Sequence, residues 1–308
     1  DCAVLRYHGA IPLSVVAGWM GGSWKDDGER TVETLVYAAG AERLFARASD
    51  GALYSAPARV DSSTMASAQQ AFRGLPCKFS GDAYAVYPET LLFEGETLTL
   101  PLLEERAIDL FAAQSGAGLE GLLAAFGFTA YTDFYTETNE QARVFVDNAS
   151  TLRVNASGLL QYASAGTDST VHAYEAGEVS GQSALDAQLD CARQILDEAL
   201  RAGETNTHAS LYAVQQSGEQ TTLVFMQLYG GVPILAESDF ATFRFTDGAL
   251  SAASIRLQRF TPQEARRTVL PARQAAAGAS GTERSMMVAY REQEDGYVPA
   301  RFYLTNEG

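Results

Sequence analysis

Three stretches of this sequence repeat one pattern, and that pattern constrains the fold more than any other feature. The stretches span residues 44–56, 152–164 and 241–253. Each holds alternating apolar residues, a turn rich in Ser, Thr or Asp that contains a glycine, and a second alternating stretch. Alternation with a period of two is typical of half-buried strands, and glycine tolerates the positive φ of a tight turn. The pattern predicts three antiparallel β-hairpins, with Gly51, Gly158 and Gly248 in their turns.

Each predicted hairpin carries an arginine on its first strand, at Arg47, Arg153 and Arg244. In the second and third hairpins the arginine alternates with apolar residues such as Val154 and Phe243. Because successive side chains of a strand point to opposite faces, these arginines are expected to point away from the core into solvent. The stretch from 142 to 164 is therefore interpreted as scaffold.

Helical periodicity appears between the hairpins. The predicted helices span residues 65–72, 102–111, 119–126 and 184–201, and another begins at Thr261-Pro262. The helix over 184–201 has the strongest signals, because Ser183 and Asp186 form a near capping box, leucines line one face, and Gly203 follows the last turn. Strands are predicted after it, at 209–216 and 221–229.

The second half of the chain is interpreted as a repeat. Gly-Val-Pro-Ile at 231–234 is matched by Tyr-Val-Pro-Ala at 297–300, which predicts that units 184–260 and 261–308 share one architecture. A helix followed by hairpins, without strict βαβ alternation, is typical of the α+β class. The predicted fold is α+β: tandem units of a helix plus an antiparallel β-meander, in two or three small domains.

The predicted domain organisation follows from the chain length of 308 residues, which is enough for two or three such domains. An N-terminal α+β domain is expected over 1–127, a central domain over 128–260, and a partial C-terminal repeat unit over 261–308.

Charge excludes several classes of partner. The net charge is −16, with Lys25 and Lys78 as the lysines, so the chain repels phosphate backbones and anionic headgroups. Nucleic acid and electrostatic membrane docking are therefore not expected. No window approaches the run of about 18 apolar residues that a membrane span needs. The chain starts at Asp1 without a Met, and a processed signal peptide or anchor upstream is expected.

The cysteines give no sign of a metal or redox site. Cys2, Cys77 and Cys191 are far apart, and no C-x-x-C occurs. Cys191 lies in a helical pattern and is interpreted as a small buried hydrophobe. Whether Cys2 and Cys77 form a disulfide is left open.

The search for catalytic motifs is negative. His8, His172 and His208 form no H-x-x-H or H-E-x-x-H pair, whereas a hydrolytic zinc centre usually takes several His or Cys ligands. The sequence has no nucleophile elbow, no P-loop and no dinucleotide-binding fingerprint. The sequence therefore predicts no catalytic, cofactor-binding or metal-ligating residue, and favours a non-enzymatic protein over an undetected hydrolase.

Aromatic residues are dense between 126 and 135, where alternation predicts an amphipathic strand. An exposed aromatic or apolar patch is expected near the junction of the repeated units, where free strand edges should lie. The aromatic residues that could supply it are Tyr131, Phe134, Tyr135, Tyr229 and Tyr297.

The stretch 119–164, which contains "VFVDNASTLRVNASGLLQY", resembles the central segment of the YycH/YycI family, as do the later helix and the strands with "YGGVPI". Residues 84–103 resemble that family's N-terminal domain. The family comprises extracytoplasmic accessory proteins of an essential sensor histidine kinase of low-GC Gram-positive bacteria. The start of the unit formed by that later helix and the strands with "YGGVPI" is similar to a PepSY-like module.

The resemblance implies a function without catalytic residues. It implies a regulator that modulates a membrane sensor histidine kinase of a two-component system through protein–protein contacts, with a paralogous accessory protein as a second partner. It also implies a place outside the cytoplasm, tethered by an N-terminal membrane helix that this chain lacks. The alternative is a PepSY-like module that binds a peptide or a protease.

Overall fold

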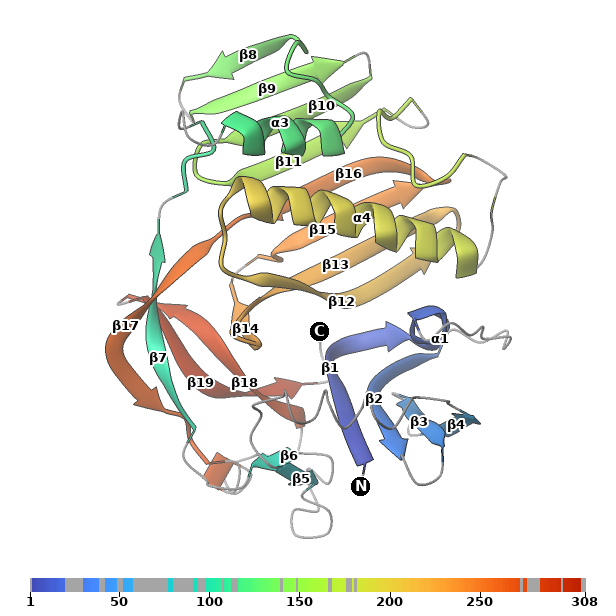
Figure 1. The fold of residues 1–308 in the computed structure, drawn as a ribbon, viewed down its shortest axis with the longest axis vertical. Helices are drawn as coiled ribbons and strands as arrows, with labels where there is room; N and C mark the ends of the chain where they lie inside the picture. The colour runs from blue at the N-terminus through green and yellow to red at the C-terminus, as the bar shows by residue number, and fades with distance from the viewer. Residues whose placement is uncertain are drawn as a thin grey trace. The chain divides into compact units, whose positions relative to one another are not determined.

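Strand dominates this protein, as Figure 1 shows for a computed structural model of the chain. The structure describes residues 2–19, 30–38, 42–48, 52–57, 77–79, 91–93, 98–106, 108–111, 116–138, 141–147, 149–165, 168–175, 179, 182–236, 238–271, 274–275, 283–294 and 296–305. Strands make up 58% of it and helices 18%. The predicted α+β fold of tandem helix-plus-meander units is wrong. The protein is mostly β, and 17 of its described strands belong to a large mixed sheet.

The chain folds into two compact units, and it passes between them more than once. The larger unit holds Asp1–Arg59, Arg106–Leu228 and Ser238–Arg259. The smaller unit holds Val60–Glu105, Tyr229–Glu237 and Phe260–Gly308. The boundaries expected from sequence, after residues 127 and 260, stay a prediction.

The sheet of the larger unit has one continuous strand order. From one outer strand to the other it runs β4 (Leu53–Pro57), β3 (Arg43–Ala48), β2 (Thr31–Ala38), β1 (Cys2–Pro12), β12 (His208–Ser217), β13 (Gln220–Tyr229), β15 (Ala241–Thr246), β16 (Ala249–Arg256), β11 (Leu159–Ser164), β10 (Ser150–Asn155), β9 (Ala142–Asp147) and β8 (Phe134–Glu137). Neighbours are antiparallel except β1 and β12, which are parallel where Ala10 pairs with Ala213.

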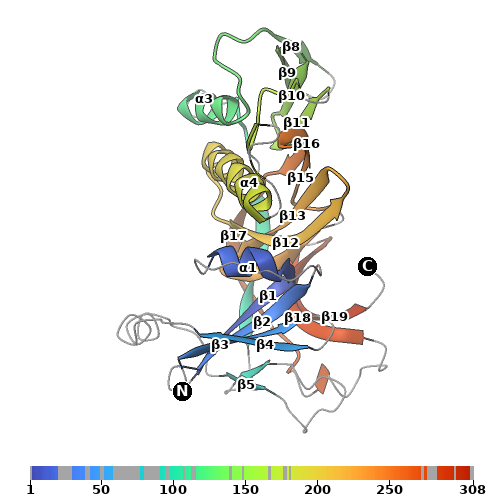
Figure 2. The ribbon, with the colours of Figure 1, turned by 90° about the vertical axis from the view of Figure 1, so that its right-hand side faces the viewer.

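Three helices accompany this sheet in the described residues: α1 (Leu13–Trp19), α3 (Gly116–Ala125) and α4 (Gln182–Ala202). Figure 2 shows α3 and α4 side by side over one face of the strands. The helices predicted over 119–126 and 184–201 are confirmed as α3 and α4. α4 ends at Ala202, directly before Gly203 as expected, although the residue with a positive φ there is Glu204 (46°).

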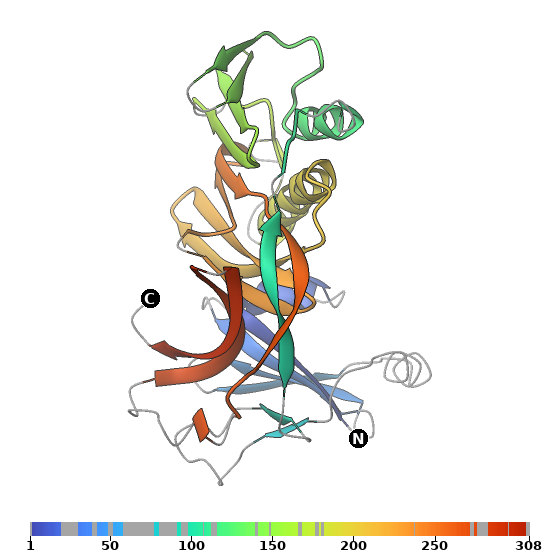
Figure 3. The same ribbon diagram turned by 90° about the vertical axis from the view of Figure 1, so that its left-hand side faces the viewer.

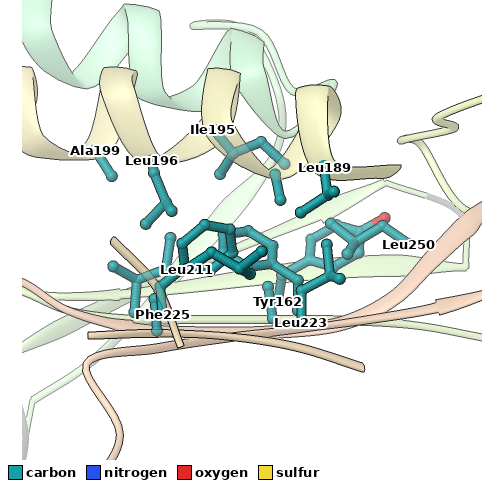
Figure 4. Packing of buried hydrophobic residues seen from close by; sticks show 14 of the residues in the cluster. Tyr162, Leu189, Ile195, Leu196, Ala199, Leu211, Leu223, Phe225 and Leu250 are labelled. Carbon is teal, nitrogen blue, oxygen red and sulfur yellow. The ribbon is translucent and has the colours of Figure 1, made fainter. Parts of the chain in front are cut away.

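The core of the larger unit fills the space between α4 and the strands. Leu189 and Leu196 of α4 point toward the strands, where Leu223 and Phe225 of β13 lie (Figure 4), and each of the four is at most 4% exposed. Burying an aliphatic or aromatic side chain of this size contributes about 1.5–3 kcal/mol. The apolar stripe that the sequence placed on α4 is therefore the contact that holds the helix on the sheet.

The three predicted hairpins are confirmed, as the antiparallel pairs β3–β4, β10–β11 and β15–β16. Gly158 has a φ of 94° and Gly248 a φ of 82°, as their turns require. A Cβ on Gly248 would also lie 2.5 Å from the carbonyl oxygen of Tyr174. Gly51 lies outside the described residues.

The strands of the smaller unit also follow one continuous order, and the unit has its own core. Its strands run in the order β17 (Arg259–Thr268), β7 (Thr99–Arg106), β19 (Gly296–Thr305), β18 (Glu283–Gln293) and β14 (Val232–Leu235), and Figure 3 shows β7 beside β17. β5 (Cys77–Phe79) and β6 (Leu91–Phe93) form a separate pair. Buried residues pack together between these strands: Leu103, Ile234, Phe260, Tyr290 and Tyr297.

Two predicted helices of the smaller unit are wrong. Residues 102–111 do not form a helix: Thr99–Arg106 is strand β7, and Leu103 pairs with Tyr297 of β19. The helix predicted to begin at Thr261 is strand β17, whose end is held to β7 through the hydroxyls of Thr99 and Thr268, 3.1 Å apart. In both places pairing with a distant strand overrides a local helical pattern. The helix predicted over 65–72 lies outside the described residues.

The predicted repeat of units 184–260 and 261–308 is wrong, because the first begins with helix α4 and the second with strand β17. The two matched Val-Pro segments lie in β14 and β19, which are the two neighbours of β18. Ile234 and Pro299 both pair with Tyr290, one in parallel and the other in antiparallel register. The similarity therefore reflects two strands that flank the same strand.

Candidate functional site

Three of the exposed aromatic residues of the larger unit lie where α3 leads into β8. The predicted strand over 126–135 is wrong for most of its length, because a turn occupies the residues before Phe134. Gly127 (φ 74°) ends the helix, and the backbone N–H of Thr129 donates to Thr132 Oγ1 at 2.9 Å. Such side-chain bonds to neighbouring backbone groups favour a turn over a strand. Phe128, inside this turn, points into the core and is 2% exposed.

Three of the five aromatic residues singled out from sequence form the exposed group. Tyr131 is 96% exposed, Phe134 is 52% exposed and Tyr135 is 55% exposed. We call these three residues the aromatic edge. Tyr229 and Tyr297 instead pack in the core of the smaller unit. Exposed aromatic residues are therefore present, but the junction of repeated units near which a patch was expected does not exist, because the repeat itself is wrong.

β8 is an outer strand, and its register with β9 shows which backbone groups face outward. The strand pairs with β9 alone in the described pairings, and it lies at the end of the sheet in Figure 1. The N–H of Val146 donates to the carbonyl oxygen of Asp133 at 3.0 Å. Hydrogen-bonded and non-hydrogen-bonded pairs alternate along an antiparallel ladder, so Tyr135 also bonds toward β9. The N–H and C=O groups of Phe134 and Thr136 therefore face away from the sheet.

The ring of Phe134 is braced from the helix-covered side of the sheet. It lies 5.4 Å from the ring of Phe145, which is buried. The guanidinium of Arg143 lies 4.2 Å from the ring centre of Phe111 and 5.5 Å from that of Phe134. Cation–π contacts of this kind hold a ring in place while one of its sides stays in solvent. Phe134 is thus presented outward in a fixed position.

An ion pair braces the other side of the sheet at the same edge. Arg153 Nε donates to Glu137 Oε2 at 2.9 Å, and Arg153 Nη1 donates to Gln161 Oε1 at 3.3 Å. Arg47 and Arg244 are exposed, as predicted. Arg153 also points away from the core, but its side chain is only 18% exposed. The expectation that Arg153 is solvated is therefore wrong, since its side chain on β10 bonds to Gln161 on the neighbouring β11 and reaches across β9 to Glu137 on β8.

A group of buried hydroxyls lies behind this edge and is bonded internally. Tyr162 Oη lies 3.0 Å from Ser150 Oγ and 2.7 Å from Ser169 Oγ. Ser169 Oγ in turn lies 2.9 Å from the carbonyl oxygens of both Val171 and Leu250, and its single proton can go to either. Buried polar groups of this kind rigidify a core when every member has a partner. These hydrogen bonds hold residues 169–171 against the sheet.

The histidines lie on separate elements in the described residues. His8 is on β1, where burial, and to a lesser extent the charge of Arg6, lowers the pKa of its imidazole. His172 Nε2 is 2.8 Å from the carbonyl oxygen of Ser169, and His208 begins β12. The described part of the chain holds no group of three or more His, Cys, Asp or Glu residues arranged for a metal ion.

Cys191 lies on α4 and packs against the core, as predicted, and burial raises the pKa of its thiol to about 11. A thiol with so high a pKa is a poor nucleophile near neutral pH. The side chains of Cys2 and Cys77 lie outside the described residues.

Sequence reasoning identified the aromatic residues of this site but not the side chains that position them. Arg143 and Glu137 were not singled out, because their partners Phe111 and Arg153 lie at sequence distances that no local pattern marks. The acid–aromatic alternation of "DFYTE" was the available signal.

Comparisons with known proteins add no relative. No protein-family model matches the chain, and no curated protein or solved structure matches it either. Among the helices of the described residues, none has the length and apolar character needed to cross a membrane.

Proposed function

We propose that this chain is a non-enzymatic regulatory protein that binds a protein partner through the aromatic edge. The observation that carries the proposal is the coincidence of Tyr131, Phe134 and Tyr135, all exposed, with the outward backbone groups of an outer strand. Tyrosine is enriched among the residues that dominate binding energy at protein interfaces. A rigid, half-exposed aromatic group on a strand is costly for solubility and is expected where a partner covers it.

The proposed partner is the extracytoplasmic part of a membrane sensor histidine kinase, with a paralogous accessory protein as a second partner. The resemblance of residues 119–164 to the YycH/YycI family supports this choice, because the aromatic edge lies within that stretch. On this proposal the chain acts outside the cytoplasm, tethered to the membrane by an N-terminal helix.

The test is capture of the kinase encoded in the neighbouring genes, solubilised in detergent, by the immobilised full chain. The double variant Tyr131→Ser/Tyr135→Ser should lose capture, whereas Leu53→Ser should not. Leu53 is the matched control because it is also exposed (68%) but lies on the opposite outer strand. Equal capture by both variants would move the binding site elsewhere. No capture, with unchanged kinase output after deletion of the gene, would overturn the kinase as partner.

The second candidate is a PepSY-like module that binds a peptide or a protease. The outward N–H and C=O groups of Phe134 and Thr136 favour it, because an outer strand with such groups accepts an extended peptide. Purified chain that binds or inhibits a secreted protease, and does so less well as Tyr131→Ser/Tyr135→Ser, would place this candidate first.

A further inference from the structure

We propose that the aromatic edge takes an extended segment of a different protein, which adds to β8 as a further strand and carries Lys or Arg at alternate positions. This inference rests on the proposed function and specifies the chemistry of the partner's segment. Three features of β8 support it. These are its outward backbone groups, the charges along one of its faces, and the like charges that would face each other if two copies of β8 paired.

The backbone supplies the mode of binding. Phe134 and Thr136 each direct one N–H and one C=O away from β9, as the bond from Val146 N to Asp133 O fixes. A strand placed about 4.8 Å away can pair with all four groups. Main-chain pairing of this kind gives affinity, and the side chains that alternate along the added strand give specificity.

The side chains of β8 supply the specificity. Because side chains alternate between the faces of a strand, Asp133, Tyr135 and Glu137 share the face opposite to the helices. This row reads acid–aromatic–acid, and Asp133 and Tyr135 are exposed. An added strand with cations at every second position sets them beside the two carboxylates and over the phenol ring. Opposite charges on neighbouring strands and cations over aromatic rings are both favourable.

The two acids of this row are not equivalent. Glu137 already pairs with Arg153 at 2.9 Å, so part of its charge is compensated within the fold. Asp133 is exposed, and only its backbone carbonyl is bonded to β9 in the described contacts. Asp133 is therefore the acid that discriminates most between a basic and an acidic segment. On the helix-covered side, Phe134 and Thr136 take apolar or β-branched residues between the basic ones.

A second copy of this chain fits β8 poorly in the register that pairs both outward residues, Phe134 and Thr136. The symmetric antiparallel pairing that joins Phe134 of one copy to Thr136 of the other is centred on Tyr135. It places Asp133 of one copy directly opposite Glu137 of the other, and like charges in that position are destabilising. Each copy also carries a net charge of −16. The charge of the chain thus favours a basic segment of another protein.

The test uses synthetic peptides added to the full chain. The probe is acetylated Thr-Lys-Val-Lys-Val-Lys-Thr, and its matched controls are Thr-Val-Lys-Lys-Lys-Val-Thr and the same alternating peptide with Glu for each Lys. The alternating Lys peptide should bind about ten-fold more tightly than either control, the scale set by a few favourable cross-strand pairs. It should also slow hydrogen exchange at the amides of Phe134 and Thr136.

Two pairs of variants separate strand addition from general attraction. Thr136→Pro removes one outward N–H and should weaken binding of the probe about ten-fold or more, whereas Thr136→Val keeps the N–H and should not. Asp133→Lys should reverse the preference between the Lys and Glu peptides. Asp197→Lys makes the same change of net charge on an exposed helical position and should leave the preference intact.

The outcomes also separate this inference from the proposed function. Equal binding of both Lys peptides, or equal weakening by Asp133→Lys and Asp197→Lys, would overturn the inference in favour of net-charge attraction. No peptide binding, while the kinase is still captured through Tyr131 and Tyr135, would overturn the inference and leave the proposed function standing. Peptide binding as described without kinase capture would support the inference and overturn the kinase as partner.

Discussion

The sheet of the larger unit ends in β4 on one side and β8 on the other, and the two outer strands differ in what they offer. On β4, the N–H of Ala48 on β3 donates to the carbonyl oxygen of Ala52 at 2.9 Å. The alternation of the ladder then makes Leu53, Ser55 and Pro57 the outward residues. Pro57 has no N–H to offer, and proline at an outward position of an edge strand is a known protection against unwanted pairing.

The side chains continue the contrast. Arg43 Nη2 donates to Ser55 Oγ at 2.6 Å, which ties the middle of β4 to its neighbour β3. β8 has no proline, and its outward residues are Phe134 and Thr136. At β4, one outward position has no N–H because it is a proline, whereas both outward residues of β8 keep theirs. On the proposed function, β8 is the edge that takes a partner, and four predictions test or sharpen this comparison.

The largest expected effect concerns the packing beneath each edge. Phe145 is 4% exposed and lies on β9, beside β8. The substitution Phe145→Ala should lower the free energy of unfolding by about 3–5 kcal/mol, because it leaves a cavity. Phe45 lies on β3, beside β4, and is half-buried. The substitution Phe45→Ala should lower the free energy of unfolding by about 1 kcal/mol. Urea unfolding of the two variants measures the difference. Equal losses would mean that the two ends of the sheet are equally well packed.

The next effect concerns the arginines that brace the two edges. Arg143→Ala should destabilise the fold by about 1 kcal/mol, because it removes contacts with the rings of Phe111 and Phe134. Arg43→Ala removes one exposed hydrogen bond and should stay within about 0.5 kcal/mol. Thermal unfolding compares the two, and hydrogen exchange at Tyr135, whose N–H bonds toward β9, should rise only in Arg143→Ala.

Acid should lower the stability of the fold through His8, which lies on the side of the sheet that ends in β4. His8 lies on β1, and burial, with the charge of Arg6, lowers the pKa of its imidazole below the ordinary 6.5. Folding therefore favours the neutral ring, so stability is lost as pH falls through about 6.5 toward the lowered pKa. His8→Gln should lose less stability than the parent between about pH 7.5 and pH 5.5 in urea unfolding. Identical losses would contradict the prediction. No histidine occurs in β8 to β11.

The smallest expected effect on stability comes from replacing Pro57, which gives β4 the outward N–H that it lacks. Pro57→Thr restores an outward N–H on β4 and should change stability by no more than about 0.5 kcal/mol. It should, however, raise self-association at high concentration, because a protective residue of the edge is gone. Analytical ultracentrifugation of the variant beside Thr136→Val, which leaves β8 open, measures the change. Unchanged self-association would show that something other than Pro57 protects β4.

Several elements could be predicted from sequence because their signals are local. The leucines of α4 recur with the helical period, and Gly158 and Gly248 mark turns that need a positive φ. A residue's covalent neighbours set these preferences, so they survive in any tertiary setting. The helices expected at 102–111 and from Thr261 failed because both segments are strands held by pairing with residues far away in the sequence.

The candidate site shows the same division. The sequence by itself determined that aromatic residues cluster near 131–135 and that the turn glycines define hairpins. Only the tertiary structure decided that Tyr131 is exposed while Tyr297 is buried, that Arg153 pairs with Glu137, and that β8 ends the sheet. A strand becomes an edge because no further strand joins it, and that depends on the order of the whole sheet. The pattern of residues within the strand cannot specify it.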